Sequence, residues 1–151
     1  MTGDKSGFLF QILYYNSYMM NTELPLYELI GSEAGLRALV ERFYDVMDSA
    51  PEAAQIRALH PESLKQSREK LFMFLSGWSG GPALYIQTYG HPRLRQRHMP
   101  FPIGKAERDQ WLWCMDKALA ESPFDAQLIE YLKKRFTEIA NSMQNRVDLD
   151  L

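Results

Sequence analysis

The amino-acid sequence predicts a single all-α domain, on three observations. Apolar residues recur at three- and four-residue steps in four long stretches, which is the spacing of one helical face. No stretch alternates apolar and polar residues as a half-buried strand does. The chain has 151 residues, of which 46% are hydrophobic and 24% are charged, and this composition is typical of one globular domain with its own core.

The first two helices are expected over residues 32–48 and 61–78. Ser32 is predicted to cap the first helix and Pro51 to close that region, because serine accepts hydrogen bonds from a first turn and proline interrupts a helix. Pro61 is predicted at the first position of the second helix, where proline is favoured. The apolar faces consist of Leu36, Leu39, Val40, Phe43 and Met47 in the first helix and of Leu64, Leu71, Phe74, Leu75 and Trp78 in the second.

The last two helices are expected over residues 105–120 and 125–144. Asp125 is predicted to cap the fourth helix, since an aspartate side chain can accept from the backbone of the first turn. The apolar faces consist of Trp111, Met115, Ala118 and Leu119 in the third helix and of Leu128, Leu132, Phe136, Ile139 and Met143 in the fourth. We find no internal repeat.

Residues 79–103 interrupt the helical pattern. The segment contains three glycines and four prolines, which exclude a long helix. A stretch of roughly 25 residues without a long element indicates either a functional segment or a misread one. One short helix over residues 92–98 fits between Pro92 and Pro100.

The short helix would place a histidine and three arginines close together. Leu94 and His98 are four residues apart and share a face, so His98 is expected to turn inward with Leu94. Arg93 and Arg97 lie along one flank, with Arg95 on the opposite side. Two interpretations stay open: a last-turn histidine that bonds a backbone carbonyl, or a neutral imidazole that binds iron in an apolar pocket with cations at its rim, as a haem site requires.

Three other polar side chains occur beside apolar stripes. Tyr44 would place its hydroxyl near the core, where it needs a partner, and Trp111 brings an N–H donor into the third helix. His60 directly precedes the second predicted helix. Simpler interpretations are core packing for Trp111 and an exposed capping role for His60. The sequence shows no Ser–His–Asp arrangement, paired-carboxylate motif, phosphate-binding glycine loop or zinc-ligand spacing.

Charge and cysteine content exclude several classes of protein. A net charge of −2 and a pI near 5.9 disfavour a nucleic-acid-binding protein, which normally carries a basic excess. The single cysteine, Cys114, favours a reducing compartment, and we expect the cytoplasm. No apolar run approaches the ~20 residues that span a bilayer, and the apolar start "GFLFQILYY" lacks the flanks of a signal peptide, so no membrane association is expected.

Several motifs, in order and at matching spacing, resemble the truncated haemoglobins, specifically group II, the O-type branch. The matching motifs are "LYELIG", "ERFYDVM", "RALHPE", "FLSGWSGGP", "GHPRLRQRHMPFPIG" and "ERDQWLWCM". The resemblance covers residues 25–145, which makes residues 1–24 an N-terminal extension and residues 146–151 a C-terminal tail. It implies a two-over-two helical sandwich around haem b, with a mostly irregular segment before the proximal histidine.

The resemblance also implies roles for individual residues. His98 matches the proximal iron ligand, whereas His91 has a helix-start or surface role. Tyr44, His60 and Trp111 match distal positions that stabilise a bound ligand, and Ser67 stands where ordinary globins have their distal histidine. The haem pocket would further include Phe43, Leu71, Phe74, Leu75, Leu94, Phe101 and Met115, with Lys70, Tyr85 and Arg97 near the propionates.

The function implied is reversible binding of O₂ and of other small ligands such as NO, CO or peroxide. With several distal donors, slow release of O₂ is expected, which suits NO dioxygenation or peroxidase-like chemistry with electrons from a separate reductase. The alternative is non-catalytic O₂ binding, storage or sensing. A second alternative is a haem-free helical interaction or nucleic-acid domain that uses the arginines of residues 93–97.

Overall fold

The computed structural model describes residues 24–147, and each regular element there is a helix, which confirms the all-α prediction. Apart from Leu24, the predicted N-terminal extension lies outside the described residues, as do the last four residues of the predicted tail. In chain order the elements are α2 (Leu26–Ile30), α3 (Ser32–Ser49), the 3₁₀ turn η1 (Pro51–Ala53), α4 (Ala54–Ala58), α5 (Lys65–Trp78), α6 (Leu84–Tyr89), α7 (Leu94–His98), α8 (Lys105–Ala120) and α9 (Ala126–Met143).

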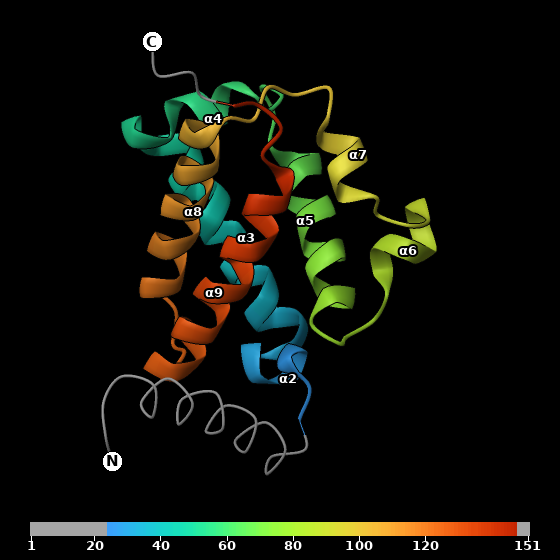
Figure 1. Cartoon of the computed structure of the whole chain (residues 1–151). Coiled ribbons are helices and arrows are strands. Elements are labelled where there is room, and N and C mark those ends of the chain that lie inside the picture. Colours follow the sequence, from blue (N-terminus) through green and yellow to red (C-terminus); the bar gives the residue numbers. More distant parts are fainter. Residues whose placement is uncertain (1–23, 148–151) are drawn as a thin grey trace, which may run out of the picture.

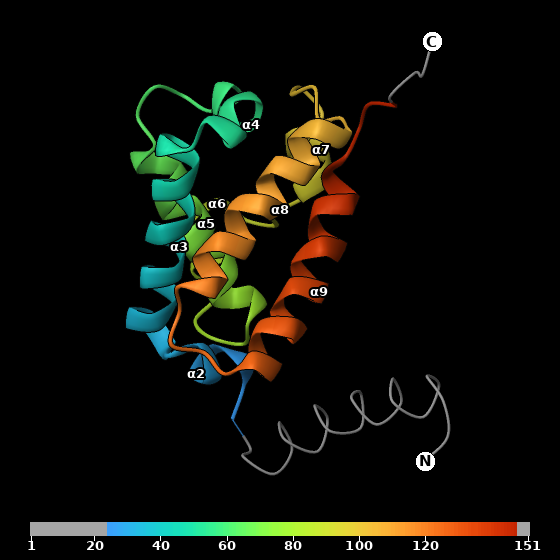
Figure 2. The same ribbon diagram turned by 90° about the vertical axis from the view of Figure 1, so that its left-hand side faces the viewer.

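The long helices form two pairs that pack face to face. Helix α3 packs against α5, α8 packs against α9, and contacts between α3 and α8 join the two pairs. Figure 1 shows α9 crossing in front of α3, and Figure 2 shows α3 and α5 on one side with α8 and α9 on the other. The short helix α6 rests on α5, and α7 rests on α9. No helix of the described part is long and apolar enough to cross a membrane.

The predicted apolar faces form the core between the two pairs. Helix α3 buries its whole predicted face, and α8 and α9 contribute Leu119, Leu132 and Phe136, each at most 1% exposed. Each such side chain stabilises the fold by about 1.5–3 kcal/mol through its removal from water. Some members of the predicted faces are only half-buried, namely Leu71, Phe74, Trp78, Trp111, Ile139 and Met143.

One predicted helix cap and one predicted helix start are wrong, although α3 does begin at the predicted Ser32. Helix α3 has Gly31 and not Ser32 as its N-cap, because α2 ends on Gly31, whose φ of 107° only glycine adopts without strain. Helix α5 begins at Lys65 and not at Pro61. The guanidinium of Arg57 donates to the carbonyls of Pro61 (2.8 Å) and Glu62 (2.7 Å), which occupies acceptors that a helix would need.

The other predicted boundaries agree more closely with the structure. Helix α8 spans the predicted residues 105–120, and the carboxylate of Asp125 caps α9 by accepting from the backbone N–H of Leu128 at 2.8 Å. The irregular segment contains two short helices instead of one, because α6 was not predicted. Helix α7 begins at Leu94, two residues later than expected, after Arg93 in a left-handed conformation with φ of 45°.

Candidate functional site

A cavity of about 560 Å³ lies where α3 and α5 face α8 and α9, and the short helices α6 and α7 close one side of it. All the half-buried members of the predicted apolar faces except Trp78 line this cavity. Their incomplete burial therefore has a single cause, which is the open volume that they share. An apolar cavity of this size with a few polar groups is typical of a cofactor or ligand site.

His98 lies at the end of α7 and lines the cavity. Its Nδ1 is 2.6 Å from the carbonyl oxygen of Leu94. A carbonyl can only accept, so Nδ1 carries a proton, and in the neutral imidazole Nε2 then has a free lone pair. This is the tautomer of a metal-ligating histidine whose second nitrogen is fixed by a backbone carbonyl.

The chain segment after α9 holds α7 in place. The side-chain amide of Asn145 donates to the carbonyl of His98 (3.0 Å) and accepts from the backbone N–H of Ile103 (3.0 Å). The backbone N–H groups of Asn145 and Arg146 both donate to the Ile103 carbonyl. Arg95 adds a bond from its guanidinium to the carbonyl of Ser142 at 2.9 Å. These bonds fix the position of α7 and therefore of His98.

Replacing Asn145 with alanine should loosen His98 while leaving the fold intact. The loss of two hydrogen bonds is expected to cost about 1–3 kcal/mol of unfolding free energy. Because α7 would then move more freely, the stretching band of the iron–histidine bond in the ferrous protein should shift or broaden in the Raman spectrum. Asn141→Ala is the matched control, because the Asn141 side chain accepts from Arg108 on α8 and bonds no residue of α7. Equal spectra for the two variants would contradict the positioning role.

Tyr44 and Trp111 bring two hydrogen-bond donors to the cavity from α3 and α8. The ring of Phe43 lies between them, with its centroid 4.8 Å from that of Tyr44 and 5.0 Å from that of Trp111. Neither the Tyr44 hydroxyl nor the Trp111 indole N–H forms a hydrogen bond with another described residue. Neither polar atom is completely buried. Both donors therefore remain available to a molecule in the cavity.

Burial raises the pKa of Tyr44 well above its usual value, and the nearby guanidinium of Arg68 opposes this only in part. The phenol therefore keeps its proton at neutral pH and acts as a donor.

His60 lies at the edge of the same cavity, on the turn after α4. Its Nδ1 is 2.8 Å from the carbonyl oxygen of Ile56, so this nitrogen carries the proton and Nε2 is an acceptor. Burial lowers the pKa of His60, and the positive charge of Arg57 lowers it further, against the effect of the Ile56 bond. The imidazole is therefore neutral at pH 7. Its ring meets that of Tyr44 edge-on, with centroids 5.9 Å apart.

Cations occupy the mouth of the cavity. Lys70 and Arg97 both line it and are both exposed. The ammonium of Lys70 lies 5.4 Å from the centroid of the Tyr89 ring, and the guanidinium of Arg97 lies 5.7 Å from that of Tyr85. A ligand with carboxylates at one end and an apolar body would fit this distribution of charge.

The structure brings twelve of the fifteen predicted site residues together around the cavity. They are Tyr44, His60, Ser67, Lys70, Leu71, Phe74, Tyr85, Leu94, Arg97, His98, Phe101 and Trp111. Phe43, Leu75 and Met115 do not line it. They are fully buried in the core, because their helical positions face the neighbouring helix and not the open volume. His91 is exposed, and its Nδ1 accepts from the backbone N–H of Arg93, which confirms its predicted helix-start role.

Several residues that line the cavity were not predicted from the sequence. These are Ile56, Leu59, Pro61, Gln66, Ile103, Glu107, Arg108, Ile139, Ala140 and Met143. Ile139 and Met143 belong to the predicted face of α9, so the face was identified and only its contact with the cavity was missed. The sequence also contained a signal for helix α6. The helix lies between Pro82 and Gly90, two residues that interrupt helices.

The residues present fit a haem. No group of three or more His, Cys, Asp and Glu side chains in the described part could chelate a bare metal ion. The cavity offers instead one histidine nitrogen with a free lone pair, an apolar lining and cations at the mouth. Haem iron needs such an axial nitrogen, and the propionates need such cations.

Comparisons with known proteins agree with this geometry. Residues 25–145 match the bacterial-like globin family. The chain is 36% identical over 124 residues to the group 2 truncated haemoglobin YjbI of Bacillus subtilis, which covers 82% of this chain and 91% of that protein.

Solved structures show the same fold. The group II 2-on-2 haemoglobin of Agrobacterium tumefaciens superposes with a TM-score of 0.79 at 46% identity, over 83% of this chain and 96% of that one. The cold-adapted truncated haemoglobin of the Antarctic bacterium Pseudoalteromonas haloplanktis has a TM-score of 0.79 at 44% identity, over 82% of this chain and 99% of that one. With the predicted two-over-two arrangement confirmed, the chain belongs to the bacterial-like globin family, as a group II truncated haemoglobin.

Proposed function

We propose that this chain holds haem b through Nε2 of His98, and that the haem-loaded protein would bind O₂ and other small ligands reversibly in the cavity, for reactive oxygen or nitrogen chemistry. One observation carries the proposal: His98 lines a cavity that also receives two donors, Tyr44 and Trp111, neither of which is hydrogen-bonded to another described residue. Haem, when bound, supplies an open iron position for O₂, NO or CO and a change of oxidation state.

The residues of this chain set the strength of ligand binding. The apolar side chains Leu71, Phe74 and Leu94 keep water out of the cavity, which strengthens each polar contact inside it. The Tyr44 hydroxyl and the Trp111 indole N–H then donate to the ligand, at roughly 1–3 kcal/mol each. Since 1.4 kcal/mol changes an equilibrium about tenfold, two such donors make O₂ release slow. Slow release suits chemistry better than delivery.

His60 adds a base to this environment. Its Nε2 accepts hydrogen bonds at neutral pH, so it can take a proton from peroxide. This property supports peroxidase-like activity. The two donors on Tyr44 and Trp111 support NO dioxygenation, because they retain O₂ until NO arrives.

We propose that the protein is cytoplasmic and that a separate reductase supplies its electrons. Cys114 is a free, fully buried thiol, and burial raises its pKa to about 11, so it stays reduced and unreactive. A protein with one inert thiol is compatible with a reducing compartment.

Absorption spectra of the ferric and ferrous protein, followed by rapid mixing with NO, test this function. We expect a Soret band, and we expect O₂-saturated ferrous protein to convert stoichiometrically to ferric protein and nitrate. Absence of a Soret band after expression with added haem would refute the haem proposal. A Soret band without nitrate formation or peroxide turnover would leave non-catalytic O₂ binding as the function.

Trp111→Phe should raise the O₂ dissociation rate by about tenfold or more, because it removes one donor at about 1.4 kcal/mol or above. Phenylalanine keeps the packing against Phe43 and Phe136. Trp113→Phe is the matched control, since Trp113 lies on the same helix but does not line the cavity. The measurement is stopped-flow displacement of O₂ by CO. An unchanged rate in Trp111→Phe would assign that residue to packing alone.

A further inference from the structure

One long stretch of this acidic chain carries no carboxylate side chain. The chain has 19 Asp and Glu against 17 Lys and Arg, yet residues 70–106, between Glu69 and Glu107, contain no Asp or Glu. The same stretch contains Lys70, Arg93, Arg95, Arg97 and Lys105. The charge of the molecule is therefore unevenly distributed, with cations gathered on the segment around α6 and α7.

Most of these cations have no counter-charge in the described part of the chain. Of the five, only Lys105 has an acidic partner there, Asp109, at 3.7 Å. The other four are exposed and form no ion pair with any residue from 24 to 147. Arg95 donates to the carbonyls of Ser142 and Gln144, which satisfies its N–H groups but leaves its charge uncompensated.

Large apolar side chains are exposed in the same stretch. Ile86 is 54% exposed, Met99 47%, Phe101 44% and Tyr89 43%. The other described large apolar residues with comparable exposure are Leu24 and Val147, at the two ends of the described chain. Exposed apolar side chains that gather with unpaired cations are typical of a surface that meets another protein.

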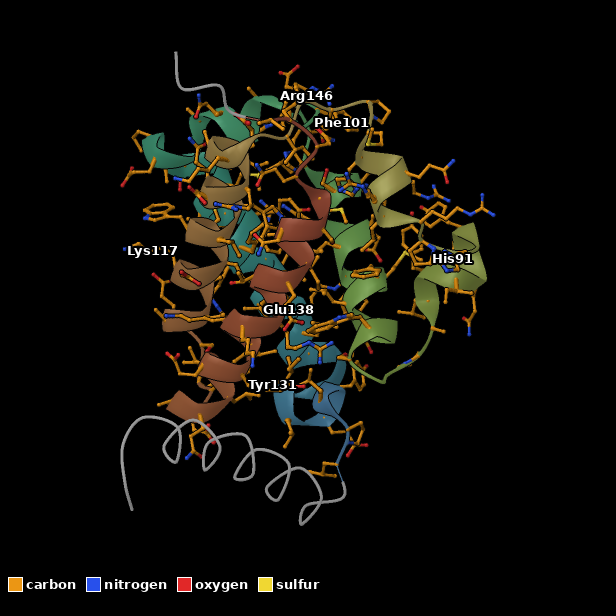
Figure 3. The ribbon with its side chains drawn as sticks, in the orientation of Figure 1. His91, Phe101, Lys117, Tyr131, Glu138 and Arg146 are labelled. Carbon is orange, nitrogen blue, oxygen red and sulfur yellow. The ribbon has the colours of Figure 1, made fainter. Side chains whose placement is uncertain are left out.

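We define the α6–α7 surface by Lys70, Ile86, Tyr89, Arg93, Arg97 and Phe101. This surface borders the cavity. Three of these residues, Lys70, Arg97 and Phe101, also line the cavity. Figure 3 shows side chains with blue nitrogen atoms projecting outward from α7, close to His91, while Lys117 lies on the opposite side of the molecule.

We propose that the α6–α7 surface is the docking site of an acidic electron-donor protein. The inference rests on the proposed function, because reactive oxygen or nitrogen chemistry leaves the iron ferric and requires its reduction. A donor seated here would bring its redox group to the side of the cavity that Lys70, Arg97 and Phe101 line, and therefore near a cofactor inside. In this step one electron leaves the donor, which is oxidised, and ferric iron becomes ferrous. No covalent bond forms.

Charge balance favours an acidic protein partner over a second copy of this chain and over nucleic acid. The two propionates of a haem could neutralise at most two of the three cations that define the α6–α7 surface, Lys70, Arg93 and Arg97, so a positive charge remains there with haem in place. A second copy of the same surface would repel it electrostatically. The net charge of −2 and the exposed apolar side chains disfavour nucleic acid, which is bound mainly through a basic excess.

The test is reduction of the ferric, haem-loaded protein by the hydroquinone of a bacterial flavodoxin, an acidic protein with FMN. The rate is followed by stopped flow at ionic strengths of about 10 and 200 mM, since screening at the higher value weakens attraction between exposed charges. Arg93→Glu is compared with Lys117→Glu, which changes the net charge equally but lies far from the surface. Both residues are exposed, and neither lines the cavity.

We expect the wild-type rate to fall steeply with ionic strength. At low ionic strength Arg93→Glu should lower the second-order rate constant about tenfold, whereas Lys117→Glu should lower it less than about twofold. Reduction by the small neutral 5-deazariboflavin radical should be equal in all three proteins, which shows that the haem itself is unaffected.

Three results would overturn the proposal. The first is an equal effect of the two variants, and the second is a rate that does not depend on ionic strength. The third is binding of vesicles containing phosphatidylserine by the wild type but not by Arg93→Glu, which would assign the surface to a membrane. Each of these results is obtained on protein with a Soret band. A protein without that band would contradict the proposed haem binding instead. Failure of the docking proposal can therefore be distinguished from failure of the proposed function.

Discussion

His98→Ala is expected to weaken haem binding by at least about a hundredfold and to remove the Soret band after gel filtration, because an axial ligand contributes more than the outer-shell groups that are worth 10–100-fold. The cavity has one wall that carries a histidine with its Nδ1 fixed by a backbone carbonyl, and alanine leaves that wall without a nitrogen ligand. The substitution lies on a short, half-exposed helix, so the core should remain folded.

Two comparisons separate loss of the ligand from loss of the fold. His91→Ala should leave the spectrum nearly unchanged, because His91 is exposed and its one side-chain hydrogen bond to a described residue is with the backbone N–H of Arg93. His98→Gly should recover a Soret band when free imidazole is added, since imidazole can occupy the space left by the side chain. A normal spectrum in His98→Ala combined with a lost spectrum in His91→Ala would mean that the ligand assignment is wrong.

Gly35→Ala is expected to destabilise the protein by about 3 kcal/mol, a typical upper cost of forcing an extra atom into a packed site. A Cβ at position 35 would overlap the carbonyl oxygen of Ile30, where the end of α2 meets the first turn of α3. The carbonyl belongs to the backbone and cannot rotate away as a side chain would. One of the two helices must therefore shift, and α3 supplies much of the core.

The matched control is Gly77→Ala, near the end of α5. A Cβ at position 77 meets Ala83 at 3.4 Å, which is ordinary contact, and alanine is favoured over glycine in a helix by up to about 1 kcal/mol. Gly77→Ala should therefore be neutral or stabilising in urea denaturation. Equal midpoints for the two variants would show that α2 adapts to the added methyl group at little cost.

The sequence was sufficient for the long helices because their apolar spacing has one structural solution. The buried residues of α3 are those that the three- and four-residue steps select, and Asp125 caps α9 as its side chain predicts. The first residue of a helix was harder to predict where a tertiary contact determined it. Pro61 is a good first helical residue by its local preference, but the carbonyls of Pro61 and Glu62 bind Arg57 instead.

The site residues were predictable where a motif identified them individually. They were less predictable where packing determines whether a side chain faces the cavity or the core. His98, Tyr44 and Trp111 carry chemistry that stands out against apolar stripes, and all three line one cavity. Spacing alone does not distinguish a side chain that faces a cavity from one that faces a helix, which is why Met115 and Leu75 lie in the core. The acceptor state of His60 depends on a bond to Ile56 that only the folded turn provides.

The bonds from Asn145 and Arg146 to Ile103 also determine where this domain can be cut. The last helix ends at Met143, yet the following residues bridge the segment that joins α7 to α8 and bond the carbonyl of His98. An expression boundary placed at the end of α9 would remove the hydrogen bonds that hold α7, the helix that carries His98. The shortest form suited to engineering therefore extends through Arg146, one residue beyond the end predicted from the sequence.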